Sequence, residues 1–237
     1  SEVIVPNFTF LSPAEAVVRG GYKLVLADIN LKDFTISLES LKKLINKNTS
    51  TLIVVHLFGN PCNMTEIKKI TDKNGIKLIE DCSQAHGAKF RGKTVGNFGD
   101  IGTFSFYPTK NLGCWGDAGA VTGDTGYCRT VRQLRNHGQT NKFDIKQVGW
   151  NARMDTLQAE VLVNKLSLLD EHNRRRREIA FMYNKEFDKL VTIPFQNKDS
   201  MHVYHQYVIK SVHIDKIKNA LAKKNIQSRT YYPIPLH

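Results

Sequence analysis

The sequence lacks several features that would assign it to a class at once. Its 237 residues contain no apolar run near the ~18 residues that a membrane-spanning helix needs, and no signal-like segment opens the chain. The four cysteines lie far apart, and none stands in a CxxC or Cys/His spacing. These absences argue against a membrane protein, a disulfide scaffold and a zinc module. We therefore expect a cytoplasmic protein with reduced thiols, no bound metal and no membrane partner.

Two further patterns are missing, and each bears on a class of ligand. No GxGxxG follows a strand-like run, which gives little support to a nicotinamide dehydrogenase. No zinc module, RNP-like motif or mixture of aromatic and basic residues supports a nucleic-acid-binding protein. The charge keeps that alternative open, because 34 Lys and Arg against 22 Asp and Glu give +12, and an arginine run covers residues 174–177. This run lies in a helical stretch, where a solvated face is the usual explanation, so we expect no nucleic-acid partner.

What the sequence does contain is an alternation typical of α/β proteins. Hydrophobic residues make up 41% and charged residues 24%, as in an ordinary globular enzyme. Short β-branched runs predict strands at 22–29, 51–57, 76–80, 102–106 and 118–121. Amphipathic stretches predict helices at 37–45, 64–74 and 127–136, and the Asn74-Gly75 pair marks a helix end. This alternation predicts an α/β fold with a mostly parallel sheet that is buried on both faces.

The last third of the chain has a different pattern. Residues 155–190 predict a long helix, with apolar residues at core spacing at Leu157, Val161, Leu162, Leu166 and Leu169. Beyond it, the sequence predicts a strand at 203–209, a helix at 214–224 and a strand or extended segment at 226–232. We therefore expect a large domain at residues 1–172 and a smaller α+β C-terminal domain at 173–237, joined by a hinge-like helix.

A first cluster of polar residues follows the strand that ends in IEDCSQAHGA. In an open parallel sheet, ligands bind beyond the carboxyl ends of the strands, so Asp81, Gln84 and His86 are positioned to reach one. The alternative for Asp81 is the cap of a helix N-terminus, because aspartate is a preferred residue there.

A second cluster, FSFYPTKNLGCWGDAGA, puts Lys110 on a tight loop after a buried strand. Desolvation at such a place lowers the pKa of a lysine toward the neutral amine that attacks carbonyl groups. The alternative is a solvated surface charge, which is the commoner role of lysine.

Together the two clusters resemble the DegT/DnrJ/EryC1 family of sugar aminotransferases. The resemblance runs in the family's order through VPNFTF, VHLFGNPCNM, IEDCSQAHGAKFRGKTVGNFGDIGTFSFYPTKNLG, GDAGAV, RNHG, GWNARMDTLQAEVL, HQYVI and YYPIPLH. It implies the aspartate aminotransferase fold (fold type I), with a mostly parallel, seven-stranded large domain that binds pyridoxal 5′-phosphate (PLP). Family members have a further segment before VPNFTF and a last helix after PIPLH, which implies that this chain is shortened or part of a longer protein.

The resemblance assigns catalytic and cofactor-binding roles. Lys110 corresponds to the Schiff-base lysine, and Asp81 to the carboxylate that keeps the pyridine nitrogen protonated, so that the ring accepts electrons from Cα. Gln84 matches the residue at the cofactor's phenolic oxygen, and Ser105 matches a hydroxyl at its 5′-phosphate. Phe10 matches the aromatic residue against the pyridine ring, with Thr9 beside it.

Other matched positions concern the partner subunit and the substrate. Asn151 corresponds to an asparagine that crosses a dimer interface to the partner's cofactor phosphate, which implies a homodimer with shared active sites. Arg153, Tyr231 and Tyr232 stand where family members contact the sugar or its anionic substituents. His137 and His205 also fall in matched motifs, but we assign them no role, because a satisfied structural histidine is the commoner case.

The implied activity is transfer of an amino group, with L-glutamate as the donor, to a nucleotide-linked keto-sugar. Lys110 would then carry the proton of the 1,3-shift. The segment KNLGCWGDAGA, which begins at Lys110 and is called the lysine loop below, and the segment NARMDTLQAEVL resemble family members that act at C3 more than those that act at C4. The product would be an amino sugar for a surface polysaccharide, a lipopolysaccharide or a glycosylated metabolite. A dehydratase subgroup of the family is the nearest alternative, but it replaces the lysine with histidine, so Lys110 argues against it.

Overall fold

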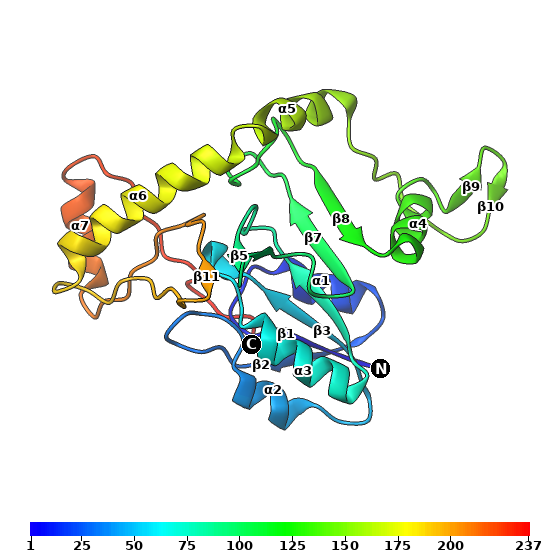
Figure 1. The fold of residues 1–237 in the computed structure, drawn as a ribbon, viewed down its shortest axis with the longest axis horizontal. Coiled ribbons are helices and arrows are strands. Elements are labelled where there is room, and N and C mark those ends of the chain that lie inside the picture. The colour runs from blue at the N-terminus through cyan, green and yellow to red at the C-terminus, as the bar shows by residue number, and fades with distance from the viewer.

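The computed structural model describes residues 1–237 and is built on one central sheet (Figure 1). The sheet has six strands in the order β2-β1-β3-β4-β7-β8. Their bounds are Glu2–Pro6 (β1), Lys23–Ala27 (β2), Thr49–Val55 (β3), Lys77–Asp81 (β4), Ile101–Ser105 (β7) and Gly119–Gly123 (β8). All neighbours are parallel except β7 and β8, which pair antiparallel. The predicted α/β fold is confirmed, and this chain supplies six strands where the resemblance implied seven.

Four helices accompany the sheet: α1 (Ser12–Arg19), α2 (Leu38–Leu44), α3 (Met64–Asn74) and α4 (Thr125–Leu134). Polar side chains begin three of them, because Ser37, Asn63 and Asp124 each accept a hydrogen bond from a first-turn N–H group. Gly75 ends α3 with a φ of 64°, in the left-handed region that glycine adopts without strain. The predicted end of this helix is therefore confirmed.

The main core lies between the sheet and helices α2 and α3. It contains Ile4, Leu52 and Leu78 from the strands, Leu41 from α2 and Met64 from α3. A second apolar cluster, with Val3 and Val5, packs on the α1 side. All five residues of β1 are buried, as a parallel strand covered on both faces requires.

Short elements connect the sheet to the rest of the chain. The 3₁₀ turn η1 (Leu57–Gly59) follows β3. A small sheet joins β11 (Ser200–Met201) to β5 (Lys89–Phe90) and β6 (Lys93–Thr94), so the C-terminal part is tied to the loop after β4. A separate hairpin is formed by β9 (Gln139–Asn141) and β10 (Asp144–Ile145).

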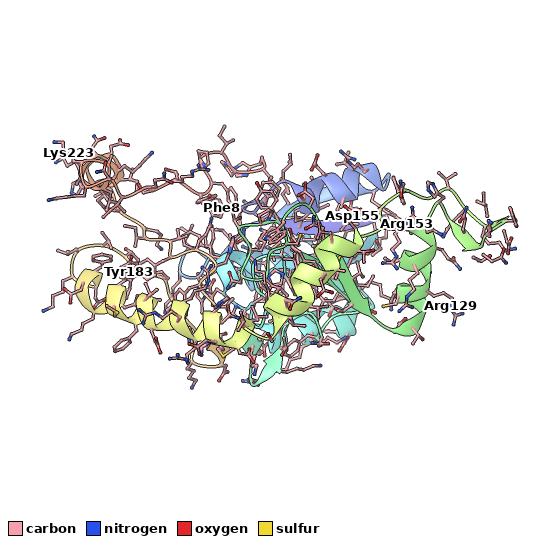
Figure 2. All side chains as sticks on the ribbon, turned by 90° about the horizontal axis from the view of Figure 1, so that it is seen from above. Phe8, Arg129, Arg153, Asp155, Tyr183 and Lys223 are labelled. Carbon is pink, nitrogen blue, oxygen red and sulfur yellow. The ribbon has the colours of Figure 1, made fainter.

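The long helix predicted at 155–190 is two helices, α5 (Thr156–Leu166) and α6 (Leu169–Phe187), with a break at Ser167 and Leu168. Helix α6 extends away from the sheet toward α7 (Ile214–Ala222), as Figure 1 shows. Figure 2 shows Tyr183 on α6 and Lys223 after α7 at the opposite end of the molecule from Arg129 on α4.

The core spacing predicted along this stretch is only partly correct. Leu162 and Leu169 are buried, and they pack with Leu112 and Cys114 of the lysine loop. Leu157 and Leu166 are 61% and 56% exposed, so their assignment to the core was wrong. The physical reason is that α5 contacts the lysine loop along one narrow side only.

The strand predicted at 203–209 is also wrong, since this segment is an irregular loop. Its backbone binds the η1 turn instead of a strand, with Val203 N–H donating to the Gly59 carbonyl and Gln206 N–H to the Phe58 carbonyl. Residues 226–232 likewise form no strand, so of the two predictions for this segment, a strand or an extended segment, the strand was wrong. The chain end returns to the sheet, where Leu236 N–H donates to the Asn7 carbonyl.

None of the helices combines the length and the apolar character needed to cross a membrane.

Candidate active site

A cavity of about 840 Å³ opens beyond the carboxyl ends of β4 and β7, in the position expected for a ligand site in a parallel sheet. Its walls come from the loop after β1, the ends of β4 and β7, the lysine loop and the C-terminal segment. Most residues that the sequence assigned to the cofactor or substrate line it: Thr9, Phe10, Asp81, Gln84, Ser105, Lys110, Tyr231 and Tyr232. Residues that are more than two hundred positions apart in the sequence therefore meet at one place.

Lys110 lies in the tight turn that follows β7. Its backbone N–H group donates to the Tyr107 carbonyl, and the loop closes where Cys114 N–H donates to the Phe106 carbonyl. A Cβ atom at Gly113 would lie 2.6 Å from the Tyr107 carbonyl oxygen, so glycine is needed there. Burial lowers the pKa of Lys110, while the nearby Asp81 carboxylate opposes this shift. The loop thus increases the fraction of neutral amine at a given pH.

Asp81 is the last residue of β4. Its Oδ1 atom accepts a hydrogen bond of 2.9 Å from the Ser83 N–H group, and its Oδ2 atom has no partner within the protein. The residues after Asp81 form turns and no helix, so the alternative role as a helix cap was wrong. Asp81 therefore keeps one carboxylate oxygen for a donor in the cavity.

Gln84 has a fixed amide orientation. Its Oε1 atom accepts a hydrogen bond of 2.6 Å from Phe58 N–H, which forces the Nε2 atom to the other side, where it donates to the Tyr232 hydroxyl at 3.3 Å. Burial raises the pKa of Tyr232, which keeps this hydroxyl neutral. The Gln84 amide therefore presents a donor toward the cavity wall.

The remaining cofactor candidates differ in exposure. Thr9 is buried, whereas Phe10 is 59% exposed at the rim. Ser105, at the end of β7, accepts a hydrogen bond from Tyr107 N–H, and its own hydroxyl proton remains available. These three residues offer two hydroxyl groups and one aromatic face to a ligand.

Asn151 and Arg153 lie outside this cavity. Both are exposed in the segment before α5, and the Arg153 guanidinium donates to the Asn151 side chain at 3.5 Å. Figure 2 shows Arg153 near the start of α5, with Asp155 beside it. The reach of Asn151 into a partner's site stays a prediction. His137 also lies away from the cavity, where its N–H donates to the Trp150 carbonyl.

Several cavity residues were missed by sequence reasoning or left without a role. Ser83, Tyr107, Asp117, His205 and Arg229 all line the wall. His205, which the sequence placed in a matched motif without a role, is contributed by the loop that had been predicted as a strand. Arg229 carried no signal beyond standing two residues before Tyr231.

His86 does not line the cavity, contrary to the expectation that it reaches a ligand. It is buried behind the wall, with its ring 5.7 Å from that of Phe104 and 5.6 Å from that of Phe106. Burial, aided by the charge of Lys110, lowers the pKa of His86 to about 4. It is therefore a neutral residue of the packing behind Lys110.

Three buried groups of metal-ligand type, His56, Glu80 and Cys82, also meet near the end of β4. The Glu80 carboxylate accepts hydrogen bonds from the N–H groups of Gly96, Phe98 and Gly99 and from the His56 ring. The other His56 nitrogen, Nδ1, accepts a hydrogen bond from Cys62 N–H. These bonds use the lone pairs that a metal would need, so the cluster is a structural hydrogen-bond network.

Two arginines of the run at 174–177 form ion pairs within the protein, and a third binds backbone carbonyls. Arg174 pairs with Glu171 and Glu178, and Arg175 pairs with Glu178. The Arg176 guanidinium donates to the backbone carbonyls of Tyr204 and His205. The run therefore forms ion pairs and holds a loop, which weakens the nucleic-acid alternative.

The profile of the DegT/DnrJ/EryC1/StrS aminotransferase family matches residues 1–237. The chain belongs to this family. A curated relative, UDP-N-acetyl-3-dehydro-alpha-D-glucosamine 3-aminotransferase from Acidithiobacillus ferrooxidans, is 40% identical over 238 residues. The match covers 100% of this chain and 64% of that relative. The chain therefore spans just under two thirds of the length of a family enzyme.

Solved structures agree with this membership. DesV of S. venezuelae, solved in complex with a ketimine intermediate, matches with a TM-score of 0.97 and 36% identity, over 100% of this chain and 65% of that one. NtdA from Bacillus subtilis, solved with the bound cofactor PMP, has a TM-score of 0.89 and 29% identity, over 100% of this chain and 56% of that one. The fold is thus that of the fold type I aminotransferases.

Proposed function

We propose that the protein carrying this chain is a PLP-dependent aminotransferase that acts on a nucleotide-linked keto-sugar. The main support is the cavity in which Lys110, with its pKa lowered by burial, lies near the Asp81 carboxylate. The name of the relative from Acidithiobacillus ferrooxidans supports a 3-keto substrate over a 4-keto substrate. We take L-glutamate as the amino donor, on the basis of the family resemblance.

The donor set fits PLP. Lys110 offers an amine for the aldehyde carbon, and the free Asp81 Oδ2 atom offers an acceptor for the pyridine N–H group. Gln84 offers an amide donor for the phenolic oxygen, Ser105 a hydroxyl for the phosphate and Phe10 an aromatic face. The bound cofactor supplies an electron sink that makes the substrate's Cα–H bond acidic.

The chain's own residues then perform the proton chemistry. Lys110, as a neutral amine, accepts the proton from the substrate's Cα and returns it to the atom at the other end of the 1,3-shift. The Asp81 carboxylate holds a proton on the cofactor's ring nitrogen. Tyr231 and Tyr232 line the same cavity and contact the sugar. Arg153 lies outside this cavity, and we assign it to the anionic part of the sugar on the basis of the family resemblance alone. We give Asn151 the same shared-site role as its family counterpart, in a homodimer.

The domain boundary and the compartment are part of the same proposal. We infer a PLP domain at residues 1–172 and a small domain at 173–237, which meet at the cavity through Tyr231 and Tyr232. The free state of all four cysteines agrees with a reducing compartment, and we infer the cytoplasm. The product is an amino sugar of the kind used in surface polysaccharides, lipopolysaccharides or glycosylated metabolites.

The direct test is chemical labelling of the purified protein. Borohydride reduction in the presence of PLP should attach the cofactor to Lys110, as peptide mass spectrometry would show. The Lys110→Ala variant should carry no label, whereas Lys142→Ala, which removes an exposed lysine in the β9–β10 hairpin, should label normally. A label at another lysine in Lys110→Ala would contradict the assignment of Lys110 as the Schiff-base lysine.

The substrate is tested by incubation with glutamate and a panel of UDP- and dTDP-linked 3-keto and 4-keto sugars. We expect a mass increment for an amino group on a 3-keto sugar. Asp81→Asn should retain PLP but lose most turnover, since an amide does not hold the pyridinium proton. Turnover of a 4-keto sugar alone would contradict the C3 proposal.

A further inference from the structure

A buried chain of polar groups runs behind Lys110. Asn173 on α6 is 1% exposed, and its Nδ2 atom donates to the His86 backbone carbonyl at 2.8 Å. Asn111, the residue after Lys110, is 6% exposed and donates from Nδ2 to the Asn173 Oδ1 atom at 2.8 Å. The Asn111 Oδ1 atom lies 3.2 Å from Nδ1 of His205. This row of hydrogen bonds thus connects α6, the hinge helix, with the lysine loop and the cavity wall.

Backbone carbonyl groups, which only accept hydrogen bonds, fix which atom donates and which accepts at each link of this row of hydrogen bonds. The His86 carbonyl requires the amide nitrogen of Asn173, and the Val203 carbonyl, 3.1 Å away, requires the amide nitrogen of Asn111. The Asn111 oxygen then faces His205, so His205 must donate from Nδ1. Its other ring nitrogen, Nε2, is consequently left with a lone pair.

The surroundings keep this ring neutral. Burial lowers the pKa of His205 to about 3, and the charges of Lys110 and Arg176 act in the same direction. Arg176 also holds the backbone of the loop through the Tyr204 and His205 carbonyls. His205 lines the same cavity as Lys110. The cavity wall therefore offers a neutral acceptor near the reactive lysine, with its tautomer set from the hinge helix.

Gly87 is part of the same arrangement. Its φ is +77°, and a Cβ atom there would lie 2.9 Å from the Nδ2 atom of Asn173. A larger residue would push Asn173 away from the His86 carbonyl and loosen the first link of the chain. The glycine of AHGA thus lets the hinge helix approach closely enough to bind.

We propose that His205 is a positioning residue for Lys110, whose amine donates a hydrogen bond to the His205 Nε2 atom and is thereby oriented toward the carbon that gives up its proton. This proposal rests on the proposed function, since it concerns the same proton transfer. Asn111 and Asn173 act through His205 by fixing its tautomer.

The tautomer is tested first in the cofactor-free protein, independently of any activity. Long-range ¹H–¹⁵N spectra of ¹⁵N-histidine protein, assigned with His205→Gln, should show a protonated Nδ1 and a lone-pair Nε2 at neutral pH. Asn173→Ala should weaken this preference, whereas Asn184→Ala, on the same helix and bound to Tyr207 instead, should not. A doubly protonated ring, or one protonated at Nε2, would overturn the proposal.

The positioning role is tested with two amides at residue 205. Glutamine carries its amide near the place of Nε2, whereas asparagine carries it near the place of Nδ1 and keeps the bond to Asn111. If His205 positions Lys110, His205→Asn should lose about tenfold in kcat with little change in KM, the size of one lost hydrogen bond. His205→Gln should retain more activity. A purely structural role predicts the reverse order, which would refute the inference.

The result can be separated from failure of the proposed function. If wild type lacks transamination but shows the expected tautomer, the aminotransferase proposal fails while the hydrogen-bond chain stands. If wild type is active and His205→Asn equals or exceeds His205→Gln, the positioning role fails alone. Thermal denaturation of each variant checks that it is folded, and His205→Asn can assign the wild-type signal if His205→Gln does not fold.

Discussion

The two halves of this molecule are held together by different means. In the sheet region, residues 1–123, strands and helices bury one another, and β1 is buried at all five positions. The helical region, residues 124–237, has little core, and neither α4 nor α7 contains a buried residue. Of the 53 buried residues, only nine belong to it: Gly138, Leu162, Leu169, Asn173, Ala180, Ser200, His202, Val203 and Tyr204.

Those few residues show how the helical region is attached. Asn173 and Val203 are bound to Asn111 in the lysine loop, and β11 pairs with β5. Leu162 and Leu169 also pack on Leu112 and Cys114, so the attachment combines specific polar contacts with small apolar clusters. The sheet region contains most of the buried core, and the helical region contributes Asn173 and His205 to the contacts beside Lys110.

The largest contrast between the regions should appear in core truncations. Leu52→Ala, at a fully buried position of β3, should lower the free energy of unfolding by about 2–5 kcal/mol, because it leaves a cavity in a packed core. Leu166→Ala, at a 56% exposed position of α5, should change it by no more than about 0.5 kcal/mol. Urea denaturation followed by fluorescence measures both values. Equal losses would mean that α5 carries as much core as the sheet.

A second effect concerns pH at the boundary between the regions. The pKa of His86 falls from 6.5 to about 4 on folding, because the ring is buried. Above pH 6.5 the ring is neutral in both states and has no effect. As pH falls toward 4, the unfolded chain binds a proton that the folded chain does not, so stability is lost, by at most about 3 kcal/mol since one pKa unit is about 1.4 kcal/mol.

His86→Leu should reduce this acid sensitivity, because it puts an apolar side chain that binds no proton between Phe104 and Phe106. Melting temperatures of the variant and the wild type between pH 7 and pH 4 provide the comparison. His213→Leu, at an exposed histidine before α7, is the matched control and should leave the pH dependence unchanged. Parallel pH curves for His86→Leu and the wild type would contradict a desolvated ring.

The smallest effect should come from an exposed contact between the regions. Arg91 pairs with Asp199 at 3.1 Å, next to the β5–β11 pairing, and its side chain is 59% exposed. Arg91→Ala should cost less than about 1 kcal/mol, because water screens such pairs. Hydrogen exchange at Ser200 and Met201 should increase even so, since the local attachment loosens. A loss as large as that of Leu52→Ala would show that ion pairs, not the core, hold the regions together.

The sequence by itself determined the α/β layering and the place of the site. The period of the apolar residues predicts α3 with the observed bounds, and Gly75 ends it, because helix and turn preferences act over a few residues. Asp81 could be assigned to a ligand site because it ends a strand of a parallel sheet, and the family resemblance then joined Lys110 to it. The helix and the position of Asp81 need only local pattern, whereas the pairing with Lys110 needed the order of motifs along the whole chain.

Only the tertiary structure decided the break at Ser167 and Leu168, the loop at 203–209 and the contact between His205 and Asn111. The loop avoids a strand because its N–H and carbonyl groups bind the η1 turn and Arg176 instead of a neighbouring strand. Asn111 and His205 are 94 positions apart in the chain, and neither carries a local signal of the other. Backbone groups accept whichever partner folding brings near, so contacts of this kind follow from packing and cannot be inferred from a short stretch of sequence.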